Sequence, residues 1–300
     1  MEQALAERIA EGSRSTRRRR GEVEEREVID TEGFARNGYT ILPAVFTPDE
    51  IDRMRLLFLQ QFQTRGGFAG RLKTIRSAVV PDAFNRDPRI AEFVLRPRIL
   101  NALNVLIGQP VHYLHHSDIH LNWSGGWHRD SIDKPSYYDF VQTDIWDPKL
   151  WADYKVYKVA VYLQDHSNNT EGLNIVPGSH TRRSAERPTE EALRSNVGDA
   201  VIFDTRLVHR GVLSHELEGS KTFIDGSNRM SIFSSYGADN AMSREFSEGT
   251  VWRQNMQVQK EEYALDPRVV DVLDDRGVGV LPINNRPYPR SLTSMYETMI

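Results

Sequence analysis

The sequence contains no cysteine, and this absence removes several classes of functional site. Disulfide frameworks, thiolate metal sites and cysteine nucleophiles are all excluded, and the absence fits a reducing cytoplasm, where we expect the protein to reside. Any metal site must therefore use histidine, aspartate or glutamate side chains. Only nine histidines occur among the 300 residues, so few combinations of ligands are possible.

Long apolar runs and phosphate-binding glycine motifs are also missing. No segment approaches the ~18 uninterrupted apolar residues of a membrane span. The N-terminus lacks the apolar stretch of a signal peptide. A net charge of -4 gives no general case for binding nucleic acid or an anionic membrane. There is no GxGxxG fingerprint and no phosphate loop, so we expect neither nucleic-acid nor membrane partners.

The charged residues are unevenly distributed along the chain. Residues 1–28 combine a run of four arginines, Arg17 to Arg20, with several glutamates that follow it. Runs of opposite charge rarely pack into a core, so we expect a solvated N-terminal arm here. Residues 29–300 are expected to form one domain. Its predicted parts are a helical region at 47–108, a β core at 110–236 and a C-terminal extension at 237–300.

Helix signals come first in this domain. Thr47, Pro48 and Glu50 form a capping box with proline in the first turn, which predicts a helix start. Apolar residues then recur at helical spacing and should face the core: Ile51, Met54, Leu57, Phe58 and Phe62. Two further helices are predicted at Arg89–Leu95 and Pro97–Ile107, with Gly108 ending the second.

Strand signals dominate from about residue 110. An early strand is expected at Gly38–Pro43, and the later ones at Val111–Asn122, Lys155–Leu163, Leu173–Val176, Ala200–Phe203 and Arg229–Ser235. Helices followed by short strands favour a mainly β fold with flanking helices (α+β), a jelly roll of the double-stranded β-helix, cupin-like type. The proline-containing tail from about residue 265 is expected to pack in extended form over the outside of the sheet.

One short motif indicates chemistry. In Trp127-His128-Arg129-Asp130 the histidine and the aspartate are two residues apart, so on a strand both side chains point to the same face. His209, far downstream, can supply a third ligand. Two imidazoles and one carboxylate on one face of a metal suit non-haem Fe(II) and leave positions open for a co-substrate and O2.

Flanking motifs make this pattern specific. In order along the chain they are Gly38-Tyr-Thr-Ile-Leu-Pro43, Trp127-His-Arg-Asp130, Pro177-Gly-Ser-His180 after Glu171-Gly-Leu173, and Gly198-Asp-Ala-Val-Ile-Phe203 leading to His209. This ordered set, over roughly residues 33–236, resembles the phytanoyl-CoA dioxygenase-like family of Fe(II)/2-oxoglutarate-dependent oxygenases.

The resemblance implies a double-stranded β-helix core that binds Fe(II) through His128, Asp130 and His209. It also implies oxidation of a substrate by O2, coupled to conversion of 2-oxoglutarate into succinate and CO2. Halogenating relatives carry a small residue in place of the carboxylate, which makes room for halide. Because Asp130 is present, the resemblance favours hydroxylation or another oxidation over halogenation.

A 2-oxoglutarate enzyme also needs a cation for the distal carboxylate, and the arginine fork binds carboxylates bidentately. The resemblance places this arginine on the strand after the distal histidine. Arg229 is the best candidate, with Ser231 on the same strand face. The 20-residue interval from His209 is longer than the family pattern implies. Arg210 is the alternative, although its neighbour His209 must point to the opposite face.

Several further residues could lie near such a site. His180 belongs to a turn whose histidine is structural in the family pattern. One or two of His115, His116 and His120 could line the site. Lys158, Tyr157 and Tyr162 share a strand on which one face must look inward, but parity alone does not say which. Residues 131–154 form an aromatic-rich insertion that is either a lid or a structural flap.

The leading hypothesis is therefore a 2-oxoglutarate-dependent dioxygenase that oxidises, by hydroxylation in the first instance, a small-molecule substrate, with specialised metabolism as one setting. Its cofactors would be Fe(II), 2-oxoglutarate as co-substrate and O2. A non-oxidative metal-dependent isomerase or hydrolase on the same scaffold is the alternative, because a fold does not determine function. That enzyme would not need Arg229. The identity of the substrate and the oligomeric state are not encoded in any motif.

Overall fold

The computed structural model describes residues 28–63, 78–108, 110–123, 125–130, 144–168, 172–184, 189–212, 229–258 and 262–284. Parts of several predicted features lie outside this part of the chain. They include the charged arm up to residue 27, residues 131–143 of the aromatic-rich insertion, residues 213–228 of the interval between His209 and Arg229, and residues 285–300 of the C-terminal tail.

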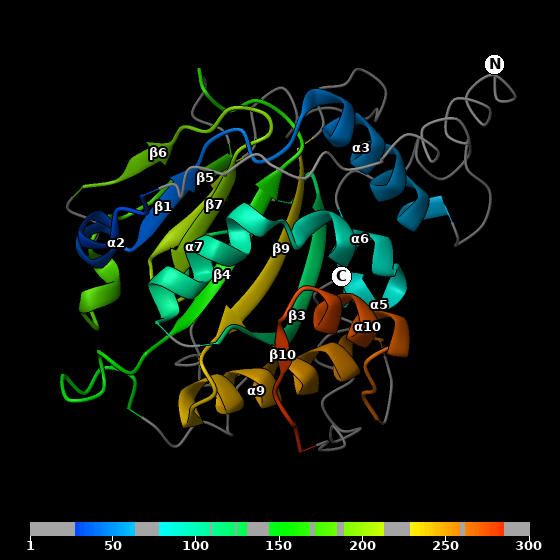
Figure 1. Ribbon diagram of the computed structural model, residues 1–300. Coiled ribbons are helices and arrows are strands. Elements are labelled where there is room, and N and C mark those ends of the chain that lie inside the picture. The colour runs from blue at the N-terminus through cyan, green and yellow to red at the C-terminus, as the bar shows by residue number, and fades with distance from the viewer. Residues whose placement is uncertain are drawn as a thin grey trace, which may run out of the picture.

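A seven-stranded sheet forms the centre of the molecule (Figure 1). Its strand order is β1-β7-β4-β9-β3-β10, with β2 also paired to β3. The strands are β1 (Tyr39–Leu42), β2 (Ala78–Pro81), β3 (His112–Leu121), β4 (Val156–Tyr162), β7 (Ala200–Asp204), β9 (Met230–Gly237) and β10 (Gly279–Val280). All pairs are antiparallel except that of β10 with β3.

A three-stranded antiparallel sheet faces the large one. Its order is β6-β5-β8, with β5 at Gly172–Ile175, β6 at Glu191–Leu193 and β8 at His209–Val212. A buried apolar cluster joins the two sheets: Ala160, Tyr162, Leu173, Ile175, Leu193, Val201, Phe203, Leu207 and Phe233. The chain thus has the predicted double-stranded β-helix architecture, and this cluster defines the inner face of the large sheet.

Helices cover the outer face of the large sheet. They are α3 (Pro48–Gln63), α5 (Ala83–Arg86), α6 (Pro88–Val94) and α7 (Pro97–Ile107). Their apolar residues share one core with outward-facing strand residues such as Val159, Val161 and Ile232. The predicted capping box is formed, because the Thr47 and Glu50 backbone amides each bond to the other's side chain. Gly108 ends α7 in a left-handed conformation, as expected.

The predicted core positions of α3 are confirmed for Ile51, Met54, Leu57 and Phe58, which are buried, while the side chain of Phe62 lies outside the described part. Helix α2 (Thr31–Asn37) precedes β1, and Asp30 accepts a hydrogen bond from the Gly33 amide at its start. In the described residues no helix is long and apolar enough to cross a membrane.

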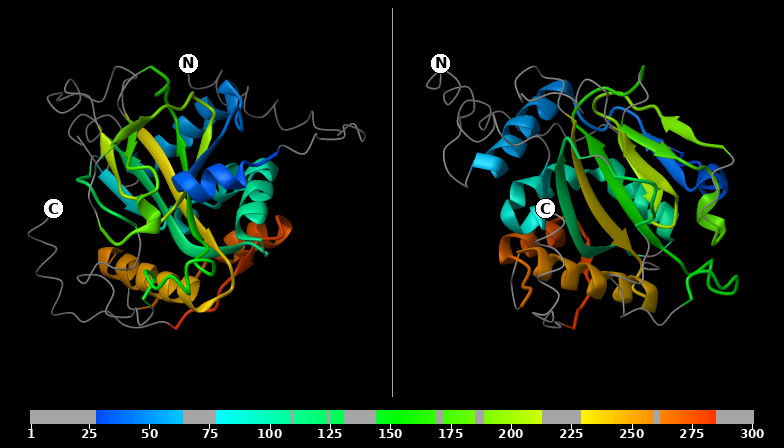
Figure 2. Two further views of the ribbon diagram at one scale, coloured as in Figure 1. Left: turned by 90° about the vertical axis from the view of Figure 1, so that its left-hand side faces the viewer. Right: turned by 180° about the vertical axis from the view of Figure 1, so that it is seen from behind.

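The C-terminal region contains two helices, α9 (Ala241–Val258) and α10 (Pro267–Asp275). Helix α10 lies in the tail that was predicted to be extended, so that prediction is wrong for these residues. Asp266 caps α10 through the Arg268 amide, with Pro267 at the first position, so Pro267 begins a helix and does not prevent one. Helix α9 crosses beneath the ends of the large-sheet strands (Figures 1 and 2).

Candidate metal centre

The segment that carries His128 and Asp130 runs beside the start of β8. His128 and His209 exchange both backbone hydrogen bonds at 2.9 Å, and the Asp130 amide donates to the Thr205 carbonyl. The sequence suggested a strand here, and the structure shows an isolated bridge between His128 and His209. This pairing brings residues that are distant in sequence into direct contact. The alternation of side chains along a strand could not by itself specify which residues pair.

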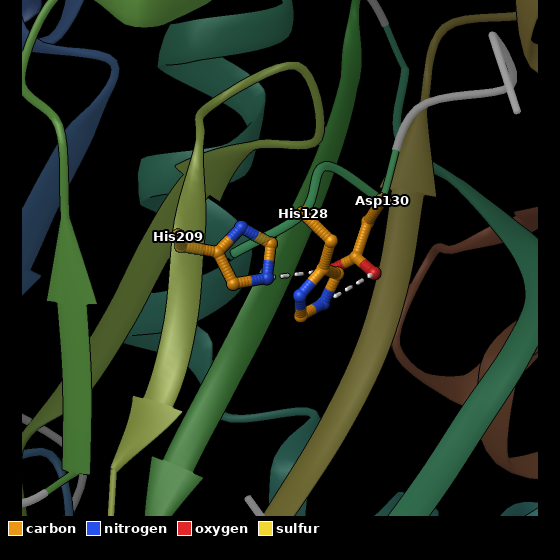
Figure 3. Close-up of side chains that lie close together, drawn as sticks. All are labelled: His128, Asp130 and His209. Atoms are coloured by element: carbon orange, nitrogen blue, oxygen red, sulfur yellow. Dashed lines mark ion pairs between the residues drawn. The ribbon is translucent and has the colours of Figure 1, made fainter. Parts of the chain in front are cut away.

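The three side chains converge on one point (Figure 3). His209 Nε2 lies 3.2 Å from Asp130 Oδ2, and His128 Nε2 lies 3.7 Å from Asp130 Oδ1. One nitrogen or oxygen atom from each side chain lies within 4.8 Å of the others. Among the described residues this is the group of His, Asp and Glu side chains that could hold a metal ion.

Backbone carbonyls determine which imidazole nitrogen faces this point. His128 Nδ1 bonds to the Gly126 carbonyl at 2.6 Å, and His209 Nδ1 bonds to the Leu207 carbonyl at 2.9 Å. A carbonyl oxygen only accepts, so each Nδ1 carries a proton and each Nε2 faces the point of convergence. When the rings are neutral, their two Nε2 lone pairs and the carboxylate form a set of three acceptors that a cation satisfies.

The charge of Asp130 is maintained by its surroundings. Burial opposes ionisation, but the Lys158 ammonium and the two imidazoles outweigh it and hold the pKa of Asp130 well below its usual range. Lys158 Nζ donates to Asp130 Oδ2 at 2.7 Å. The carboxylate is therefore ionised and oriented, as a metal ligand must be. Two imidazoles and one carboxylate are the donor set that suits non-haem iron.

Arg229 lies immediately before β9, on the large sheet. Its side chain is almost fully buried, with Nη1 donating to the Trp123 carbonyl at 2.7 Å and Nη2 to the Gly172 carbonyl at 3.2 Å. A Cβ placed on Gly211 would come within 3.2 Å of Arg229 Nη2. Since Gly211 follows His209 by two residues on β8, the guanidinium lies on the inner side of the sheet, near the converging triad.

A buried hydroxyl accompanies this guanidinium. Ser231 Oγ, two residues along the chain from Arg229, has no hydrogen-bond partner among the described residues. Ser231 pairs in the ladder with Tyr162, whose ring lies 5.4 Å from the centre of the guanidinium. The hydroxyl and the guanidinium can both donate hydrogen bonds to a carboxylate, so the two groups fit a ligand carboxylate.

Arg210, the alternative from the sequence, has a different environment. Its guanidinium stacks 4.7 Å from the Trp127 ring and lies 3.7 Å from a carboxylate oxygen of Glu190. The half-exposed Arg210 side chain packs against Trp127, the residue before His128. These contacts support Arg229 over Arg210 as the anion anchor.

The remaining histidines fall into separate roles. His180 does not join the triad: its Nε2 contacts the Ala35 carbonyl, and a Cβ on Gly38 would come within 2.5 Å of its Nδ1. The turn histidine therefore packs against the end of α2, as its structural interpretation suggested. His115 sits at an irregularity in β3 with a positive φ and bonds to the Leu281 carbonyl, away from the triad.

A buried acid–base cluster occupies the inner face of β3. Asp118 Oδ2 lies 3.2 Å from His116 Nε2, 3.3 Å from Arg253 Nη2 of α9 and 3.9 Å from His120 Nε2. Ser235 Oγ contacts His116 Nδ1 at 3.0 Å. Desolvation is the main reason that the pKa of His116 falls to about 4, and the nearby Lys158 adds to it. His116 is therefore neutral in the folded protein at neutral pH.

This environment predicts how stability varies with pH. The pKa of His116 is about 4 in the fold and 6.5 in the unfolded chain, so between these values only the unfolded chain takes up the proton. As pH falls from 6.5 to 4, we expect the free energy of unfolding to drop by on the order of 3 kcal/mol from this residue. His116→Gln should flatten the pH slope in urea denaturation, and His112→Gln, at a partly buried position outside this cluster, is the comparison.

Arg129 stabilises the loops around the triad. This buried side chain donates to the carbonyls of Arg206, Arg182, Ser184, Arg183 and, more weakly, Ser179. Its guanidinium also lies 4.7 Å from the Trp146 ring. One side chain thus fastens residues 179–184 and part of the insertion after Asp130 to the strand that bears two triad members. Sequence reasoning passed over Arg129 because its neighbours carried the recognisable motif.

Removing this side chain should loosen the loops. Arg129→Met leaves several buried carbonyls without their charged donor, which we expect to cost about 2–4 kcal/mol of unfolding free energy. Chemical denaturation followed by tryptophan fluorescence measures the loss. Arg183→Met removes an exposed guanidinium that pairs with exposed Asp144 and should change stability by less than about 1 kcal/mol. Equal effects of the two changes would contradict the fastening role.

Comparison with known families gives one match. Residues 34–212 match the phytanoyl-CoA dioxygenase (PhyH) family. This stretch is more than half of the chain and includes His128, Asp130 and His209, but it ends before Arg229. No curated protein sequence shows a significant match to the chain.

Solved structures resemble the fold at low sequence identity. EctD from S. alaskensis, solved in its apoform, has a TM-score of 0.55 and 17% identity, with 75% of this chain and 83% of that chain covered. SnoN, a non-haem α-ketoglutarate-dependent epimerase from nogalamycin biosynthesis, has a TM-score of 0.51 and 17% identity, covering 69% and 80%. SnoK, a carbocyclase of the same biosynthesis, has a TM-score of 0.50 and 18% identity, covering 70% and 84%.

Proposed function

The chain belongs to the phytanoyl-CoA dioxygenase family of 2-oxoglutarate-dependent non-haem iron enzymes, and we propose that it hydroxylates a small-molecule substrate. The observation that carries this proposal is the convergence of two imidazole Nε2 atoms and an ionised carboxylate on one point. When bound, iron and 2-oxoglutarate supply the oxidising power, and succinate and CO2 are released.

His128, Asp130 and His209 would hold the iron. Their Nδ1–carbonyl bonds fix the ring orientations before metal arrives, and the reciprocal backbone pair between His128 and His209 fixes their separation. Preorganisation of this kind lowers the entropic cost of binding. These three residues would hold the iron from one side, which would leave other coordination positions for the co-substrate and O2.

Arg229 would bind the distal carboxylate of 2-oxoglutarate, with Ser231 donating its hydroxyl to the same group. Three observations support this assignment: the guanidinium is buried, Ser231 Oγ lacks a partner among the described residues, and Gly211 leaves room beside Nη2. A bidentate fork fixes both the position and the direction of the co-substrate. Its keto-acid end would then reach the metal.

Hydroxylation is proposed because Asp130 occupies the carboxylate position, which leaves no place for a halide ligand. Two relatives show that this fold also supports other outcomes, since SnoN is an epimerase and SnoK a carbocyclase. Both come from the biosynthesis of nogalamycin. A substrate from specialised metabolism is therefore the class to test first.

The test is succinate formation in the presence of Fe(II), ascorbate, 2-oxoglutarate and O2, followed by mass spectrometry of the co-incubated substrate. Hydroxylation adds one oxygen atom to the product, carbocyclisation removes two hydrogens, and epimerisation leaves the mass unchanged. Isotope from labelled O2 should appear in a hydroxylated product. Turnover that continues without 2-oxoglutarate would refute the proposal and favour the non-oxidative alternative of an isomerase or hydrolase.

A further inference from the structure

Lys158 lies on the inner face of β4, directly beside the triad. It is opposite Phe203 of β7 and Ser235 of β9, and its Nζ lies 5.7 Å from the centre of the Phe233 ring. Neighbouring Tyr157 and Val159 belong to the outer core, so the sheet directs only the lysine inward at this point. We propose that Lys158 binds an acidic group of the primary substrate, an inference that rests on the proposed function.

The ammonium has unused hydrogen-bonding capacity. It carries three N–H donors, and in the described residues only Asp130 Oδ2 accepts from it, at 2.7 Å. The side chain is only 9% exposed. Burying an ammonium without partners is costly, so a buried lysine usually has its donors satisfied. The remaining donors are available to a ligand acceptor next to the metal centre.

The balance of charges indicates that this acceptor is an anion. Asp118 and Arg253 form one pair on the inner face. In the proposed enzyme, Arg229 pairs with the distal carboxylate of 2-oxoglutarate. Asp130 and the other carboxylate of 2-oxoglutarate balance the two charges of Fe(II). The negative charge of Asp130 would then be used by the metal, although Lys158 also contacts this carboxylate. Among the described residues, no second carboxylate pairs with the Lys158 ammonium. One negative charge on the substrate would restore neutrality.

The ladder separates Lys158 from the co-substrate anchor. Tyr162 pairs with Ser231, whereas Lys158 pairs with Ser235, four residues further along β9. At ~3.3 Å per residue these backbone positions are about 13 Å apart, so we assign Lys158 and Arg229 to different ligand groups. Since its Nζ touches a triad oxygen, an acidic group that it binds lies beside the metal. The oxidised carbon should therefore be close to that acidic group.

Binding to the Ni(II)- and 2-oxoglutarate-loaded protein tests the inference without turnover. The probes are two acids with their matched amides: benzoate with benzamide, and indole-3-acetate with indole-3-acetamide. Calorimetry should show at least one acid binding about tenfold or more tightly than its amide. Lys158→Met and Lys158→Gln should abolish this preference, and Lys158→Arg should retain it. Lys149→Met, at an exposed position, is the matched control and should behave as wild type.

Three outcomes would overturn the inference. In the first, no acid binds the wild-type protein more tightly than its amide. In the second, the preference for acids survives in both neutral variants. In the third, the variants weaken 2-oxoglutarate binding without changing acid preference, which would assign Lys158 to the co-substrate. The proposed function is judged separately, because its failure would appear as loss of 2-oxoglutarate binding by the wild-type Ni(II) protein.

Discussion

Asp130→Ala is expected to abolish 2-oxoglutarate-dependent succinate formation. The change removes one of the three proposed ligands and leaves two imidazoles with no charge to balance a divalent metal. It also leaves the buried Lys158 ammonium without its described acceptor. Because even outer-shell partners of a metal site are worth ~10–100-fold, we expect turnover to fall by roughly a thousandfold or more. Ni(II) affinity, measured by calorimetry, should fall in parallel.

Asp275→Ala is the control for this change, because Asp275 is an exposed residue at the end of α10. It should keep wild-type metal affinity and turnover. His128→Ala and His209→Ala should resemble Asp130→Ala, since each removes one member of the same set. Retained turnover in any of the three variants would show that the assignment of that ligand is wrong. Circular dichroism separates loss of metal from loss of the fold.

Arg229→Met is expected to raise the Kd for 2-oxoglutarate by about 100-fold, or roughly 3 kcal/mol. Truncating one partner of a buried charge pair typically costs this much. Arg229→Lys keeps the charge but loses the planar fork, so we expect a smaller weakening of about tenfold. Both values are measured by calorimetry on the Ni(II)-loaded protein. Metal affinity without co-substrate should remain near that of wild type.

Arg210→Met separates the two arginines that the sequence proposed. Arg210 stacks on Trp127 and pairs with Glu190, so its loss should change the Kd for 2-oxoglutarate by less than about threefold. Should Arg210→Met weaken binding more than Arg229→Met, the anchor must be reassigned. Ser231→Ala should add a modest loss, because Ser231 Oγ is buried beside the proposed carboxylate position.

Local chemistry explains why most of the fold could be predicted. The capping box at Thr47, the glycine after Ile107 and the period-two strands each rest on neighbouring residues, and the structure confirms them. Helix α9 was missed because polar residues that are buried in the structure, such as Ser243, Ser247 and Thr250, interrupt its apolar pattern. Only the tertiary structure provides a surface on which such small polar residues pack.

Long-range contacts explain what the sequence left open at the candidate site. The motif around His128 predicted the triad, and the structure brings its members together. The inward direction of Lys158 could not be deduced, because strand parity has two equivalent solutions until a partner strand is known. The contacts of Arg129 with residues 179–184 likewise depend on a loop that no local pattern places.

In the proposed enzyme, the double hydrogen bond between His128 and His209 would make metal binding depend on packing against the small sheet. It holds the segment that bears two of the proposed ligands against β8. By linkage, a change that loosens this contact would then weaken metal binding, even if every proposed ligand remains in place. Bound metal would in turn stabilise the packed form of this segment by the same free energy. The amount of metal bound per protein would then measure how well this contact is formed. Variants with a loosened contact would be purified with less metal before they lose their fold.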